Sequence, residues 1–152
     1  MKRKLVAPGR MYAVKLEEGE EVLETLKELL ESQGVDAALI MGIGGLSEAV
    51  IGFYSPEERK YKVAEVKPRE GMVIEVASIE GNAVNTEKGV HVHLHTVLSI
   101  DPERTIAGHL VKGVVRPHME VFVIEALGRP GGVLEVFEHR RNLNVGYEKW
   151  RG

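Results

Sequence analysis

Residues 90–115 read VHVHLHTVLSIDPERTIAGHLVKGVV, and this stretch decides how the chain folds. Apolar and β-branched residues are frequent in both halves, which is typical of strands. The sequence DPER at 101–104 stands between the halves and is rich in turn-forming residues. The stretch therefore predicts two antiparallel strands, 90–100 and 105–115, joined by a short turn.

Further strands are expected on both sides of this hairpin. Short apolar or alternating runs bounded by Gly and Pro predict them at 12–16, 35–41, 49–54, 61–66, 72–79, 119–127 and 133–138. Successive strands with short connections favour antiparallel pairing, so most of the chain is expected to form one antiparallel-rich sheet.

One segment alone has a long helical period. Its apolar residues recur at helical spacing, and they are Val22, Leu23, Leu26, Leu29 and Leu30. Glutamates fill the opposite face, and Gly34 is typical of a helix end. These features predict a helix at about 20–33. The expected fold class is α+β, with one main amphipathic helix packed on the antiparallel-rich sheet.

Length and composition indicate a single domain. The chain has 152 residues, with 43% hydrophobic and 28% charged residues and no Cys, which is typical of a globular protein in a reducing compartment. No apolar run approaches the roughly 18 residues that a membrane helix needs. We expect one cytoplasmic domain over 1–152 that has no membrane contact, with its core at about 10–138. The few amides among abundant Glu, Lys and Arg favour a thermophilic source.

The last stretch, 140–152, differs from the rest in being basic and aromatic. Its characteristic residues are Arg140, Arg141, Tyr147, Lys149, Trp150 and Arg151. Because a Trp is rarely left in water, we expect this tail to pack on the domain or on a neighbouring subunit rather than on nucleic acid.

Five of the six histidines cluster in the hairpin region, and they are His91, His93, His95, His109 and His118. Alternate residues of a strand share a face, so His93 and His95 point the same way. A hairpin about 101–104 sets His109 opposite His95. Three imidazoles with an open fourth position are a known zinc arrangement. The geometry therefore predicts a site for zinc or a similar divalent metal at His93, His95 and His109, with His91 and His118 ranked lower.

Several interpretations of this cluster stay open. The leading one is a metal-binding or regulatory module. The second is a metal-dependent enzyme acting on a small substrate, with Glu75 or Glu120 as general base, although the spacing places neither carboxylate near the ion. In a third, the histidines are a polar row on an exposed strand face and hold no metal. No catalytic residue is assigned.

Other motifs in the chain do not carry a function by themselves. The glycines at 42–45 lack the spacing of a dinucleotide or phosphate loop, and no Ser stands in a motif that would activate it as a nucleophile. The net charge of −3 and the acidic outer face of the expected helix oppose DNA binding. Gly128-Arg129-Pro130 lacks the flanking basic residues of a minor-groove hook. Any DNA binding is therefore expected to be weak and insensitive to sequence.

A series of short motifs runs through the chain in a fixed order. They are Gly42-Ile43-Gly44, residues 49–52, Tyr61, residues 74–82, His93-Leu94-His95, Gly108-His109-Leu110, Gly113 and Glu120-Val121. Together they resemble the plant and prokaryote conserved domain, also called the PPC domain or DUF296, over about residues 10–137.

The resemblance to the stand-alone prokaryotic type implies further properties. It implies a homotrimer of α+β domains, a biochemical role that is largely unassigned, and a frequent association with DNA binding. The plant members carry a separate DNA-binding hook that this chain lacks. His93, His95 and His109 are the positions that match the stand-alone form.

Overall fold

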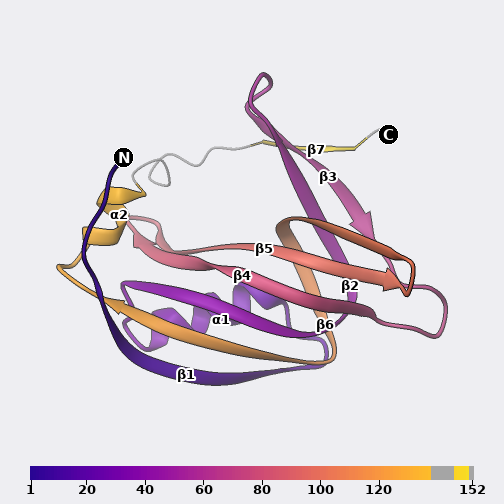
Figure 1. Cartoon of the computed structure of the whole chain (residues 1–152), viewed down its shortest axis with the longest axis horizontal. Coiled ribbons are helices and arrows are strands. Elements are labelled where there is room, and N and C mark those ends of the chain that lie inside the picture. The colour runs from indigo at the N-terminus through magenta and orange to yellow at the C-terminus, as the bar shows by residue number, and fades with distance from the viewer. Residues whose placement is uncertain (138–145, 151–152) are drawn as a thin grey trace.

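The computed structural model describes residues 1–137 and 146–150, and Figure 1 shows their arrangement. Its strands are β1 (Ala7–Glu17), β2 (Ala37–Ser55), β3 (Lys60–Val66), β4 (Ile74–Thr86), β5 (Gly89–Asp101), β6 (Arg104–Leu127) and β7 (Gly146–Lys149). Its helices are α1 (Val22–Ser32) and α2 (Gly132–Val136). Among the described residues, no helix has the length and apolar character needed to cross a membrane.

The expected α+β class is wrong, because the fold is mainly sheet. Strands hold 65% and helices 11% of the described residues. The expected main helix exists as α1 but is only 11 residues long. The sheet is larger than expected because the segments 42–48 and 116–118, which were expected to separate strands, lie inside the long strands β2 and β6. The β2–β6 pairing continues through this region with shifts of register. The expected strand at 133–138 is also wrong, since its residues 133–136 belong to α2.

The sheet has seven strands in the order β1-β6-β5-β4-β2-β3-β7, with an additional pairing between β6 and β2. All pairs are antiparallel except β3 with β7, so the sheet is mixed. The pairings β2–β4, β4–β5, β5–β6 and β6–β2 close these four strands into a ring. The sheet therefore has a covered inner face and an outer face.

The inner face holds the core, and α1 packs on it. Val22, Leu26 and Leu30 of the helix are fully buried. The carboxylate of Glu21 accepts hydrogen bonds from the N–H of Glu24, which caps the helix, and from the N–H of Gly113 on β6, both at 2.9 Å. The helix start is thereby fixed to the sheet.

The described part of the C-terminal tail pairs with β3, which agrees with the expected packing on the domain, although its aromatic residues Tyr147 and Trp150 are more than half exposed. Strand β7 runs parallel to β3 (Figure 1), and the N–H of Trp150 donates to the carbonyl of Val63 at 2.7 Å. The ring of Trp150 lies 6.4 Å from that of Phe53. The basic residues Arg140, Arg141 and Arg151 lie outside the described residues.

Candidate metal centre

Three histidines meet on the outer face of the sheet. His93 and His95 lie on β5 with Leu94, which is fully buried, on the opposite side. His95 pairs with His109 on β6, so the expected hairpin register is confirmed. One ligand atom from each of the three imidazoles lies within 4.8 Å of the others. Neighbouring elements thus bring the three side chains to one point.

The ring positions fit a metal ion. The ring centroids are 5.2 Å apart for His93 and His95, 4.9 Å for His93 and His109, and 5.7 Å for His95 and His109. Zinc binds imidazole nitrogens at about 2.0–2.1 Å, which sets tetrahedral ligands about 3.3 Å from one another. Small side-chain rotations would close the triangle to that size. His95 is exposed and the other two are half-buried, so an ion could enter from solvent.

The two lower-ranked histidines lie outside this group. His91 pairs with Val84 near the start of β5, one step along the strand from His93. His118 is exposed and pairs with Glu17 of β1. Neither of them belongs to the group of three described above.

The turn between β5 and β6 is fixed by the buried carboxylate of Asp101. It accepts hydrogen bonds from the Nε of Arg104 at 2.7 Å and from the N–H of Glu103 at 2.9 Å. The hydrogen bond from Arg104, with that from Glu103, lowers the pKa of Asp101. The charged carboxylate therefore ties the turn that sets His95 opposite His109.

Strand β4 adds two polar residues that the sequence did not assign to the site. Asn82 pairs with His93, and Glu80 pairs with His95, so both lie on the outer face beside the imidazoles. The carboxylate of Glu80 accepts a hydrogen bond from the hydroxyl of Ser78 at 3.1 Å. The sequence signal that could have indicated their position is the short turn of two residues before Gly89, because this turn sets the register between β4 and β5. Of the two suggested general bases, Glu75 pairs with Ser99, near the far end of β5, and Glu120 pairs with residues of β1 and β2.

Two glycines give the site its close packing. Gly81 on β4 pairs with Leu94, and a Cβ at Gly81 would overlap the carbonyl oxygen of His93. Gly52 on β2 pairs with His109, and a Cβ there would lie 3.0 Å from the ring of Tyr61. Tyr61 of β3 stacks on His109 with ring centroids 4.6 Å apart and an interplanar angle of 18°. The absence of a side chain at Gly52 lets this ring approach the histidine.

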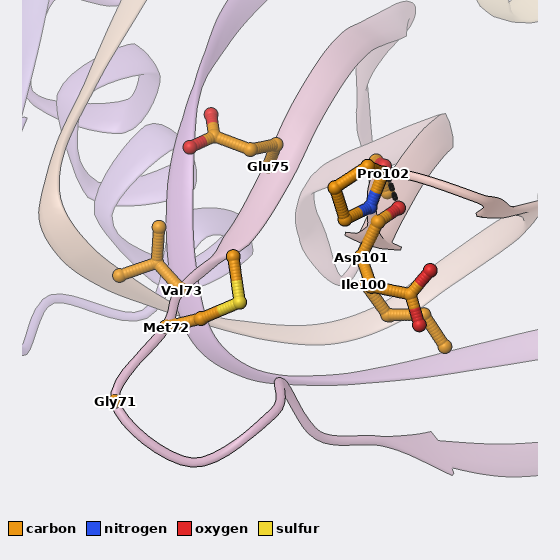
Figure 2. Close-up of a pocket in the computed structure, with 8 residues that line it drawn as sticks. Gly71, Met72, Val73, Glu75, Ile100, Asp101 and Pro102 are labelled. Atoms are coloured by element: carbon orange, nitrogen blue, oxygen red, sulfur yellow. Dashed lines mark hydrogen bonds between the residues drawn. The ribbon is translucent and has the colours of Figure 1, made fainter.

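A separate cavity of about 410 Å³ lies at the other end of the β5–β6 hairpin. Figure 2 shows Met72 and Val73 on one side of it and Ile100, Asp101 and Pro102 on the other. None of the described residues that line it is a histidine. The cavity and the three-histidine group are therefore distinct features.

Comparison with known proteins identifies the family. The family model of the Plants and Prokaryotes Conserved (PCC) domain matches residues 3–127. The chain belongs to the PCC domain family. This confirms the resemblance found in the sequence.

Two solved structures are similar to this chain over most of its length. A plant- and prokaryote-conserved protein from Pyrococcus horikoshii is 33% identical, with a TM-score of 0.77 over 85% of this chain and 87% of that chain. The metal-containing protein AF0104 from Archaeoglobus fulgidus is 30% identical, also with a TM-score of 0.77, over 86% of this chain and 89% of that chain.

A more distant structure shares the fold alone. It is a protein from Bacteroides thetaiotaomicron that is assigned provisionally to DNA binding, and it is 22% identical, with a TM-score of 0.70 over 83% of this chain and 87% of that chain. Among curated proteins, none matches the chain.

Proposed function

We propose that this PCC-domain protein is a metal-binding or regulatory module that holds zinc, or a similar divalent ion, at His93, His95 and His109. The observation that carries the proposal is the convergence of the three ligand atoms within 4.8 Å. The Archaeoglobus relative, at 30% identity, is described as metal-containing, which supports the same chemistry in this chain. Imidazole nitrogen is a preferred ligand of zinc.

Three protein ligands would leave one coordination position open. When bound, zinc supplies a positively charged centre to which a water molecule or an anionic ligand can attach. The chain itself contributes the three imidazoles and the neighbouring polar residues Glu80 and Asn82. Such a site suits the recognition of a small ligand. A metal-dependent enzyme stays an alternative prediction from the sequence.

The first expected result is that the purified protein, after incubation with zinc and removal of excess ion, retains about one zinc per chain. Elemental analysis of the desalted protein measures this ratio, and magnesium provides a comparison because it prefers oxygen ligands. Retention of magnesium but not zinc, or no retention of either, would contradict the proposed site.

We also infer that three copies of the chain associate through the outer face of the sheet. Leu39, Met41 and Phe122 are 47%, 41% and 48% exposed, although they are large and apolar. Met41 pairs with Phe122 across β2 and β6, so these side chains form one continuous patch. An apolar patch of this kind is typical of a subunit contact, and the trimer itself comes from the family resemblance.

Sedimentation equilibrium at micromolar concentration is expected to give three times the mass of one chain. Met41→Lys introduces a charge into the patch and should shift the protein to smaller species, because an unpaired charge in a subunit contact is costly. Glu28→Ala, at an exposed position of α1 on the other side of the sheet, is the control and should leave the mass unchanged. A monomeric unmodified protein would refute the assembly.

DNA binding stays a prediction of weak, non-specific affinity. The formal net charge is −3, and Glu24 in the first turn of α1 belongs to an acidic helix face. Like charge on that helix opposes contact with phosphates.

A further inference from the structure

The ring of Tyr61 covers one side of the proposed ligand His109. The two rings are nearly parallel, at 18°, and their centroids are 4.6 Å apart. Tyr61 reaches this position from β3, which does not pair with β6, by lying over the bare backbone of Gly52 on the strand between them. The stack is therefore a contact between residues that are distant in the sequence.

Strand β7 covers the other side of this contact. Tyr147 pairs with Tyr61 in the parallel β3–β7 ladder, and their rings stack at 5.9 Å with an interplanar angle of 19°. The rings of Tyr147, Tyr61 and His109 thus follow one another in a row of near-parallel neighbours. The C-terminal strand reaches the metal site through one intervening side chain.

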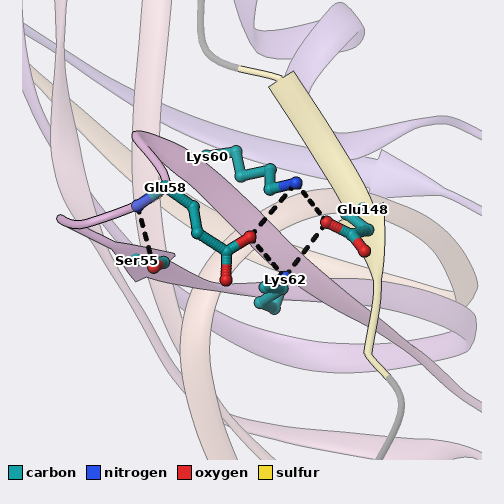
Figure 3. Close-up of polar contacts among 5 residues, drawn as sticks. All are labelled: Ser55, Glu58, Lys60, Lys62 and Glu148. Carbon is teal, nitrogen blue, oxygen red and sulfur yellow. Dashed lines mark hydrogen bonds and ion pairs between the residues drawn. The ribbon is translucent and has the colours of Figure 1, made fainter.

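Charged side chains fasten β7 to β3. Figure 3 shows Lys60 and Lys62 each pairing with Glu148 of β7 and with Glu58. The hydrogen bond from Lys60, together with that from Lys62, lowers the pKa of Glu148 to about 2. Glu148 consequently keeps its charge at any pH near neutrality. The hydrogen bond from Trp150 to Val63 adds a backbone link beyond the ladder.

We infer that Tyr61 is a positioning residue for His109, and that β7 holds Tyr61 in place through Tyr147. This inference rests on the proposed function. A flat ring stacked on an imidazole restricts the rotation of that imidazole, so His109 keeps an orientation close to the one that binds the ion. Without the stack, metal binding would have to order the ring as well, which weakens affinity. Tyr61 itself does not contact the ion.

Zinc affinity of the full chain, measured by competition with a chromophoric chelator, tests this inference. Tyr61→Ala should bind zinc about tenfold more weakly, in the range typical for loss of a residue that orients a ligand. Tyr61→Phe keeps the stacked ring and should restore the affinity to within about twofold of the unmodified protein. Comparison of the two variants therefore distinguishes the effect of the hydroxyl group from the effect of the stacked ring.

A matched control and a remote variant complete the experiment. Tyr54→Ala removes a ring that also contacts Tyr61, at 5.4 Å and 59°, but that is not stacked on His109, so its affinity should change by less than about twofold. Tyr147→Ala removes an exposed ring, which the fold should tolerate, and should weaken binding about threefold. The NMR signals of the His109 ring, displaced by the stacked Tyr61, should shift in Tyr61→Ala and not in Tyr61→Phe.

The outcomes separate the two proposals. If the unmodified protein binds zinc and Tyr61→Ala binds it equally well, the positioning role is wrong and the metal site stands. If Tyr61→Ala does not fold, Tyr147→Ala decides, and an unchanged affinity overturns the role of β7 and Tyr61. If the unmodified protein binds no zinc, the proposed function fails and the inference fails with it.

Discussion

Replacing His95 with Ala is expected to lower the zinc affinity more than about 100-fold, because loss of a residue that merely orients a ligand already costs about 10–100-fold. His95 lies within 5.2 Å of His93 and 5.7 Å of His109, measured between ring centroids. Its removal leaves two imidazoles, which cannot complete a three-ligand site. Zinc competition with a chelator measures the change.

The matched control is His118→Ala. His118 is an exposed histidine of β6 that lies outside the group of three. It should retain zinc at the level of the unmodified protein, and circular dichroism should show that both variants keep the sheet. Equal zinc affinity of the two variants would contradict the assignment of His95 as a ligand.

Gly81→Ala is expected to lower the free energy of unfolding by about 3 kcal/mol, at the upper end of the cost of overpacking. A Cβ at Gly81 would overlap the carbonyl oxygen of His93, and because that oxygen belongs to the backbone, β4 and β5 would have to separate. The strain falls where Asn82 pairs with His93, so zinc affinity should fall as well. Urea denaturation without and with zinc measures both effects.

Gly132→Ala is the control for this substitution. Gly132 is the first residue of α2, and the nearest atom to its added Cβ, on Arg129, is 3.9 Å away. Ala favours a helix over Gly by up to about 1 kcal/mol, so this variant should unfold no more easily than the unmodified protein. Equal stability of Gly81→Ala and Gly132→Ala would show that the β4–β5 pair is not close-packed at this point.

The sequence predicted the local elements well and their extent poorly. The helix expected at 20–33 is α1, at Val22–Ser32, because its apolar period is a property of consecutive residues. The fold class was wrong because glycines and Pro117, which usually interrupt strands, lie within β2 and β6. β-bulges accommodate these glycines and Pro117 only when a partner strand is paired with the segment, and the local sequence pattern does not indicate which strand that is.

The sequence alone determined the convergence of His93, His95 and His109. Alternation along a strand and a short turn fix side-chain faces and register within a few tens of residues, so the hairpin is encoded locally. Only the tertiary structure decided what surrounds these residues: the pairing of β6 with β2, and the positions of Tyr61 and Tyr147 over His109. Such pairings join distant segments, and their stability comes from burial that the whole sheet provides.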